Sequence, residues 1–352
     1  MAKKTSRPVG PDKIPASINP HLPARQRRAH DAAYYLQGIL AGDRVVLSQA
    51  ITLVESTQVA DQVKARQIVE GCLPHSGQSF RLGITGVPGV GKSTFIETFG
   101  LQLVSQGYRV AVLAVDPTSQ LTHGSILGDK TRMGQLSVHP AVYIRPSPAG
   151  EALGGVAAKT RELMLLCEAA GYNFILVETV GVGQSEVAVH QLTDFFLLLL
   201  LPGGGDELQG IKRGVVEMAD LIAVNKADED RELAAQQARA TYQGALHLFP
   251  AKPSGWIANA VTCSALTGKG IAEIIHTLHA YEQATRASGY FGHHRQEQAV
   301  HWLQHILAAG VLQQFYARPD IAAQLPALRA AVRAGDMSPQ AAVERLLGGF
   351  IR

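Results

Sequence analysis

Residues 86–94 read Gly86-Val87-Pro88-Gly89-Val90-Gly91-Lys92-Ser93-Thr94, and the first eight match the pattern G-x-x-x-x-G-K-[ST]. They follow a short apolar run that predicts a strand and precede a stretch that predicts a helix starting near Lys92. Glycines let the backbone wrap closely and point its N–H groups at phosphates, while a helix N-terminus favours negative charge. The stretch therefore predicts a phosphate-binding loop, in which Lys92 spans the β- and γ-phosphates of a nucleotide and Ser93 ligates Mg²⁺.

On both sides of this loop, from residue 81 to 265, short apolar runs rich in β-forming residues alternate with helical stretches. The runs predict strands at Arg81–Gly86, Arg109–Asp116, Val142–Pro146, Phe174–Thr179, Phe195–Leu201, Leu221–Asn225 and Trp256–Cys263. Strands separated by helices are typical of a doubly wound, mainly parallel sheet. We therefore expect an α/β fold.

Helical patterns flank the predicted sheet. Residues 31–73 predict two helices with apolar positions three and four apart, and Ile271–Ser288, Gln296–Phe315, Ile321–Ala334 and Pro339–Leu347 predict helices near the C-terminus. The expected organisation is a basic, disordered arm (1–30), an N-terminal helical cap (31–75), a P-loop nucleotide-binding domain (76–290) and a C-terminal helical arm for dimerisation (291–352).

Composition and charge limit the kinds of partner. Of the 352 residues, 46% are hydrophobic, enough for a buried core. The first thirty residues hold seven basic side chains and one acidic, so the rest of the chain is net negative and a basic nucleic-acid surface on it is not expected. The basic composition of residues 1–30 is also compatible with an organelle transit peptide. Three isolated cysteines favour a reducing cytoplasm, and no apolar run is long enough to span a membrane.

A second motif separates guanine from adenine. Asn225-Lys226-Ala227-Asp228 follows a predicted strand, which places it at the carboxyl edge of the sheet beside the phosphate loop. There Asp228 can accept hydrogen bonds from guanine N1–H and the exocyclic amine, whereas adenine has no matching donors. Ser264-Ala265-Leu266, after the last predicted strand, supplies a second wall for the base. The sequence therefore predicts GTP and GDP as ligands.

Acidic residues at predicted strand ends are candidates for the metal site, because Mg²⁺ prefers oxygen ligands. Asp116 ends the second strand, Asp129 lies in the following loop, and Glu178 ends the strand that leads to Gly181. Glu178-x-x-Gly181 stands where many GTPases have D-x-x-G, so Gly181 is expected to sense the γ-phosphate through its amide. The alternative for each acid is an ion pair with a lysine or arginine.

With these motifs in place, the chain resembles the MeaB/ArgK family of P-loop GTPases. The matching stretches are LAVDPT (113–118), GSILGDKTRM (124–133), IRPSP (144–148), VETVGVGQSE (177–186) and residues 197–228. The resemblance implies a homodimeric, GTP-hydrolysing chaperone of an adenosylcobalamin-dependent methylmalonyl-CoA mutase or related acyl-CoA mutase, gating cofactor loading and protecting the mutase.

The resemblance also implies roles for individual residues. Asp129 acts as a catalytic acid, beside Lys92, and Asp116 and Glu178 belong to the metal shell, with Glu178 also in the catalytic group. The glycine-opened loop from Gly203 is a switch in which Asp206, Gln209 and Lys212 respond to the partner. His123 stands where the family commonly has glycine, which bears on the timing of the first switch.

Two other functions share such a pocket. A transport-associated kinase, as the ArgK label suggests, would pass the γ-phosphate to another protein, but the chain shows no separate acceptor-binding domain. A nickel-delivering GTPase usually has a histidine-rich tract or a cysteine–histidine site near its switches. Here only His293-His294 are adjacent, and they are far in sequence from the phosphate loop.

Overall fold

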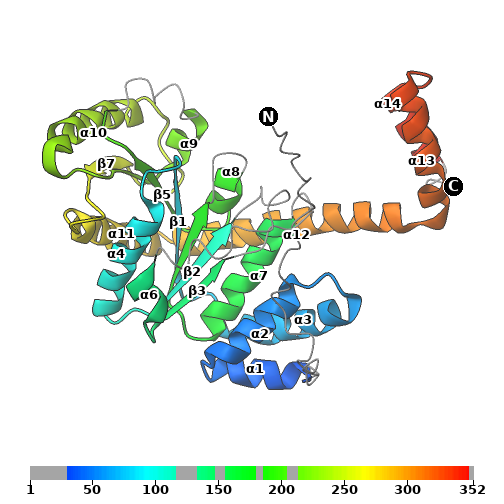
Figure 1. Cartoon of the computed structure of the whole chain (residues 1–352), viewed down its shortest axis with the longest axis horizontal. Coiled ribbons are helices and arrows are strands. Elements are labelled where there is room, and N and C mark those ends of the chain that lie inside the picture. Colours follow the sequence, from blue (N-terminus) through cyan, green and yellow to red (C-terminus); the bar gives the residue numbers. More distant parts are fainter. Residues whose placement is uncertain (1–29, 116–132, 147–154, 180–184, 204–212, 349–352) are drawn as a thin grey trace, which may run out of the picture.

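A computed structural model describes residues 30–115, 133–146, 155–179, 185–203 and 213–348. Its centre is a seven-stranded sheet in the order β3-β2-β4-β1-β5-β6-β7 (Figure 1). The strands are β1 (Phe80–Gly86), β2 (Val110–Val115), β3 (Val142–Pro146), β4 (Phe174–Thr179), β5 (Phe195–Leu200), β6 (Leu221–Val224) and β7 (Asn259–Thr262). Every neighbouring pair is parallel. The α/β prediction is confirmed, with a sheet that is parallel throughout.

Helices connect and cover the strands, as parallel pairing requires. Those within the sheet region are α4 (Lys92–Ser105), α6 (Gly134–Val138), α7 (Gly155–Ala169), α8 (Ser185–His190), α9 (Arg213–Met218), α10 (Glu232–Leu246) and α11 (Ile271–Ala287), with a 3₁₀ turn η3 (Glu229–Arg231). Among the described residues, no helix is both long and apolar enough to cross a membrane.

Alternate side chains of each strand enter different cores, because successive residues of a strand point to opposite faces. Leu197 of β5 joins Phe95 of α4 and Ile274 of α11 in one core. Its neighbours Phe196 and Leu198 lie in the cores on the other face, which α7 and α8 cover at one end and α9 and α10 at the other. All six residues of β5 are buried, in agreement with the central position expected for this unbroken apolar run.

The N-terminal segment forms three helices, so the prediction of two was wrong. They are α1 (Ala32–Leu40), α2 (Arg44–Glu55) and α3 (Val59–Cys72), followed by a 3₁₀ turn η1 (Leu73–His75). The second predicted helix, which included Ile51, Val54 and Val59, is divided at Ser56, whose backbone is extended and whose hydroxyl accepts from the amide of Gln58 and donates to Asp61. The helices pack on α7 and share its core.

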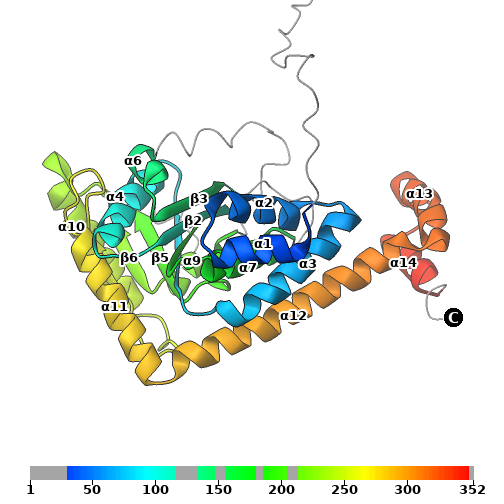
Figure 2. The same cartoon turned by 90° about the horizontal axis from the view of Figure 1, so that it is seen from below.

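Beyond the sheet, α12 (Tyr290–Ala317) is a 28-residue helix that carries the chain away from the body of the molecule (Figures 1 and 2). It begins six residues before the predicted Gln296. At its far end α13 (Pro319–Ala334) and α14 (Pro339–Gly348) pack on each other around a small core of their own. The division of the chain into four parts stays a proposal.

The edge strand β7 and its neighbour β6 are shorter than predicted. Strand β7 begins at Asn259 instead of Trp256, because Trp256 belongs to a loop: its amide donates to Ser254 Oγ and its indole N–H to the carbonyl of Asp220. Strand β6 ends at Val224, one residue before Asn225. The second predicted motif begins directly after it, held by hydrogen bonds from the amide of Asn225 to the carbonyl of Leu200 at 2.8 Å and from the amide of Ala227 to that of Cys263 at 3.0 Å.

Candidate nucleotide-binding site

The predicted phosphate loop lies between the end of β1 and the start of α4, at the carboxyl edge of the sheet (Figure 1). Gly86 has a φ of 156°, and a Cβ there would lie 2.5 Å from the carbonyl oxygen of Leu199. Gly91 precedes α4 with a left-handed φ of 95°, a conformation that other residues rarely adopt. Val90 is fully buried in the core beneath the loop. The glycines are thus required by backbone geometry, and Val90 fixes the loop to the sheet.

Lys92 folds back over this loop. Its Nζ donates to the carbonyl of Gly86 at 2.8 Å, with Val87 O at 3.5 Å. The lysine and Ser93 are half-buried, whereas Pro88, Gly89 and Thr94 are exposed. An ammonium group held by carbonyl oxygens above a helix N-terminus can exchange those oxygens for phosphate oxygens, which carry more negative charge.

Asn225 joins the two motifs of the sequence. Its side-chain amide donates from Nδ2 to the carbonyl of Val90 at 2.8 Å, and its Oδ1 accepts from the amide of Ala265 at 2.9 Å. Both bonds are buried, so their loss would leave unpaired polar groups in the interior. One side chain therefore holds the phosphate loop, the end of β6 and the segment after β7 in a fixed arrangement.

Lys226 adds a second link to the phosphate loop. Its backbone has a left-handed φ of 60°, and its Nζ donates to the carbonyl of Gly89 at 2.7 Å. A positive φ is uncommon outside glycine and is retained when the surrounding contacts favour it. The turn directs the stem of Lys226 across the loop and carries the chain on to Asp228.

Asp228 is held by two donors. The Ser264 hydroxyl donates to its Oδ2, and Arg231 donates from Nη2 to its Oδ1 at 2.8 Å. The hydrogen bond from Ser264, and then the charge of Arg231, hold the pKa of Asp228 below its ordinary value. Its side chain is 9% exposed. The carboxylate therefore stays ionised at neutral pH, as an acceptor of the guanine N–H groups must.

Leu266 is 77% exposed beside this group, whereas Ala265 is buried. The hydroxyl of Thr98, on α4, donates to the carbonyl of Ala265 at 2.6 Å and ties the segment to the helix that follows the phosphate loop. An exposed leucine next to an ordered carboxylate offers an apolar surface on which the face of a base can pack.

The acidic candidates for the metal divide into two sets. Glu178 lies in β4 with 5% exposure, and its neighbours in the sheet are Ile84 of β1 and Ala114 of β2. Next to it, the hydroxyls of Thr85 and Thr179 form a hydrogen bond at 2.9 Å. Asp116 and Asp129 lie outside the described residues, as do Gly181, Asp206, Gln209 and Lys212.

Two residues of the site were not found from the sequence. Arg231, three residues after Asp228, forms the ion pair described above. Glu97 of α4 accepts from the amides of Gln135 at 2.8 Å and Leu136 at 3.4 Å, so it joins the phosphate-loop helix to α6. The three-residue spacing between Asp228 and Arg231 could have indicated this ion pair from the sequence. Glu97 gave none, because its partners lie 38 and 39 residues away.

Comparison with known proteins agrees with this geometry. Residues 47–320 match the model of the family described as methylmalonyl Co-A mutase-associated GTPase MeaB. The GTPase ArgK of Escherichia coli is 46% identical over 305 residues, covering 87% of this chain and 92% of its own length. The mitochondrial methylmalonic aciduria type A homolog of Mus musculus is 43% identical over 350 residues, covering 96% and 84%.

A solved structure supports the same assignment. The crystal structure of a protein titled LAO/AO transport system kinase has a TM-score of 0.72 and 38% sequence identity, and the match covers 91% of this chain and 98% of that one. Both the matched family and the relatives span the phosphate loop and the Asn225–Asp228 motif. This chain therefore belongs to the MeaB family and is a P-loop GTPase.

Proposed function

We propose that this chain uses GTP binding and hydrolysis to act as a chaperone of an adenosylcobalamin-dependent acyl-CoA mutase, either methylmalonyl-CoA mutase or a related enzyme. The observation that carries the proposal is the joining of phosphate loop and base-recognition loops through Asn225, in a chain that matches the mutase-associated family over residues 47–320. In this role, nucleotide state gates cofactor loading and protects the mutase from inactivation. The action takes place in the cytoplasm, whose reducing conditions suit three buried free cysteines.

In the proposed complex, residues 86–94 enclose the phosphates and Lys92 stabilises charge on the β- and γ-phosphates. Asn225 keeps the loops together, and Asp228 accepts from guanine. Because Arg231 now occupies Asp228 Oδ1, guanine either displaces this guanidinium or shares the carboxylate with it. Ser264, Ala265 and Leu266 form the wall beside the base.

The residues present fit Mg²⁺. Ser93 stands at the first turn of α4 and Glu178 near the end of β4, and both supply the hard oxygen that this cation prefers. A Cβ at Gly86 would lie 2.5 Å from the carbonyl oxygen of Leu199, so the start of the phosphate loop packs directly on β5. Mg²⁺ would neutralise charge that develops on the phosphate oxygens. We propose Asp116 and Asp129 as further metal-shell acids, with Asp129 and Glu178 also acting in catalysis.

We further propose that the chain is a homodimer that pairs through its C-terminal arm. Along α12 a series of apolar side chains is at least half exposed: Val300, Leu303, Ile306, Leu307, Val311, Leu312 and Tyr316. Val300, Leu303, Leu307 and Val311 follow one another at intervals of three or four residues, which places them on one side of the helix. A monomer rarely leaves so extended an apolar surface in water.

The proposed response to the mutase depends on the loop that opens at Gly203. Gly203 has a φ of 91° and follows β5, whose residues are all buried in the sheet. We propose that Gly181 senses the γ-phosphate and that Asp206, Gln209 and Lys212 respond to the partner. A change in this loop would reach the nucleotide through β5 and its neighbour β1.

The test compares GTP hydrolysis with and without purified mutase. We expect the mutase to raise turnover, and Gln209→Ala and Lys212→Ala to leave the intrinsic rate nearly normal while reducing the stimulation. Arg239→Ala, at an exposed position of α10, is the control. Absence of stimulation in the unmodified protein would overturn the chaperone proposal, and transfer of the labelled γ-phosphate to a protein would support a kinase instead.

A further inference from the structure

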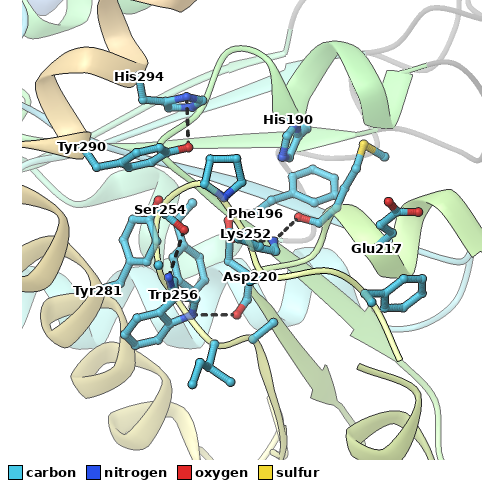
Figure 3. A pocket seen from close by; sticks show the side chains of 18 of the residues that line it. His190, Phe196, Glu217, Asp220, Lys252, Ser254, Trp256, Tyr281, Tyr290 and His294 are labelled. Carbon is cyan, nitrogen blue, oxygen red and sulfur yellow. Dashed lines mark hydrogen bonds and ion pairs between the residues drawn. The ribbon is translucent and has the colours of Figure 1, made fainter. Parts of the chain in front are cut away.

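A cavity of about 820 Å³ lies at the opposite edge of the sheet from the phosphate loop. It is bordered by the amino ends of β5 and β6, by the loop that follows α10, and by the first turns of α12 (Figure 3). None of the residues that line it belongs to the nucleotide motifs. The cavity is therefore separate from the site described above and is open to a different ligand.

Aromatic side chains form much of its wall. Tyr290 stacks on His294 with ring centroids 5.3 Å apart and an angle of 12°, and Trp256 meets Tyr281 edge to face at 5.4 Å. Phe196 and Phe249 complete the apolar lining. Rings held on several sides of one cavity favour a flat ligand, because a planar molecule can contact their faces and edges together.

The charges in the floor of the cavity are already balanced. Lys252 donates from Nζ to Asp220 Oδ1 at 2.6 Å and to the carbonyl of Met218 at 2.8 Å. The other oxygen of Asp220 accepts from the amide of Phe196 at 2.9 Å. Asp194 is paired with Arg295 at 2.7 Å. These groups hold strands and loops together, so they offer little net charge to a ligand.

Deeper in the cavity, His190 is a polar group available to a ligand. It is partly buried, its ring lies edge-on to Phe196 at 5.5 Å, and it makes no hydrogen bond to any residue that the structure describes. Figure 3 shows it above Lys252, between Tyr290 and Glu217. Burial lowers its pKa, with Asp220 opposing this effect and Lys252 and His294 adding to it. A neutral imidazole has one nitrogen that accepts a hydrogen bond.

Two carboxylates stand at the mouth of the cavity. Glu217 of α9 and Glu297 of α12 are exposed and line the cavity, and neither has an ion pair within the described ranges. The two carboxylates therefore place negative charge at the mouth, while the guanidinium of Arg213 lies over the Phe249 ring at 5.8 Å. Aromatic faces favour a cationic ligand too, because the negative face of the ring attracts positive charge.

We propose that this cavity binds a planar aromatic compound carrying a cationic nitrogen group, with its ring against the aromatic wall and its N–H groups directed toward His190 and Glu217. The site requires no nucleotide. It lies at the amino ends of the strands β5 and β6, whose carboxyl ends lead to Gly203 and to Asn225.

The test uses three planar probes of the same size and different charge. Benzamidine is cationic, benzamide neutral and benzoate anionic, and binding of each to the full chain is measured by protein-observed NMR with ¹⁵N-labelled histidine. We expect benzamidine to bind about tenfold more tightly than benzamide, as a cation–aromatic contact of that size would give, and benzoate to bind most weakly. The imidazole signal of His190 should shift with benzamidine.

Two substitutions in the cavity test whether benzamidine binds there. His190→Leu and the exposed Glu217→Gln should each weaken benzamidine about threefold to tenfold, in line with the loss of one hydrogen bond. Arg239→Ala should not change it, and neither should saturating GDP. The proposal is overturned if benzamidine does not bind, if benzoate binds as well, if GDP displaces it, or if neither variant weakens it. Glu217→Gln keeps the test decisive should His190→Leu fold poorly.

Discussion

The two edges of this sheet use charged side chains in different ways. At the amino edge, buried charges are paired with each other: Arg81 with Glu168, and Arg295 with Asp194, both through two nitrogens. At the carboxyl edge, Lys92 and Lys226 donate to carbonyl oxygens of the phosphate loop. Paired charges are costly to separate, whereas an amine on a carbonyl can move to a phosphate. The first arrangement holds the fold, and the second leaves room for a ligand.

The strongest test of this contrast is Glu168→Ala. The side chain of Arg81 is 8% exposed, and it would lose its partner. We expect a loss of about 3–5 kcal/mol in the free energy of unfolding, measured by urea denaturation. The exposed pair of Glu232 and Lys269 is the control, and Glu232→Ala should change stability by less than about 1 kcal/mol. Equal effects of the two variants would remove the distinction between the edges.

The same ion pair has a pH signature. Burial alone would raise the pKa of Glu168, but Arg81, together with hydrogen bonds from Ser79 and Gly77, outweighs burial and holds it below its ordinary value. A lowered pKa in the folded state adds stability that is complete above the unfolded value and is lost as pH falls through the folded value. The stability difference between the unmodified chain and Glu168→Ala should therefore shrink in acid.

Lys92→Ala should have the next largest effect, on binding and not on folding. Loss of a positive charge beside the phosphates should weaken GDP by about a hundredfold, equal to about 2.7 kcal/mol. Titration calorimetry with GDP measures the affinity, and urea denaturation of the same variant should give a nearly unchanged midpoint. Undiminished GDP affinity would take Lys92 out of the phosphate site.

The residues changed in Lys92→Ala and Glu168→Ala also differ in how well the sequence alone predicted their contacts. The phosphate loop was predictable because its glycines and Lys92 act within nine consecutive residues, and the bounds of β3 and β4 were predicted to the residue. Arg81 was placed in a strand, but its partner Glu168 is 87 residues away. A pair of that kind depends on how helix α7 packs against the end of β1, and no local sequence pattern predicts it.

The same reasoning accounts for the errors. The break between α2 and α3 depends on Ser56, whose hydroxyl accepts from the amide of Gln58 and donates to Asp61, a local signal that apolar spacing alone overlooked. The loop around Trp256 has strand-like composition, yet its indole donates to the carbonyl of Asp220, 36 residues away. Composition therefore favoured a strand where tertiary contacts favoured a loop.

Asp228→Asn should alter base preference more than fold. An amide at this position keeps one acceptor and gains a donor, so it suits xanthine, which has a carbonyl where guanine has an amine. We expect GDP to weaken by about 2 kcal/mol, as for loss of a charge-assisted hydrogen bond, and xanthosine diphosphate to gain relative to GDP. Competition between the two nucleotides measures the change. A variant that still prefers GDP to the original degree would place the base elsewhere.

The smallest effect on GDP affinity at neutral pH is expected from Ser264→Ala, which tests how the carboxylate of Asp228 is kept ionised. The Ser264 hydroxyl is the main cause of the lowered pKa of Asp228, and Arg231 adds to it. Because guanine needs the ionised carboxylate, binding by the unmodified chain should weaken only at a pH below the ordinary range of aspartate. Without the hydroxyl the pKa rises, so the loss of GDP affinity should begin at a higher pH, while affinity at neutral pH falls by only about 1 kcal/mol. GDP titrations across the acidic range, with Thr267→Ala as a neighbouring control, measure this shift. If the pH profiles of Ser264→Ala and the unmodified chain coincide, the hydroxyl positions the loop without tuning Asp228.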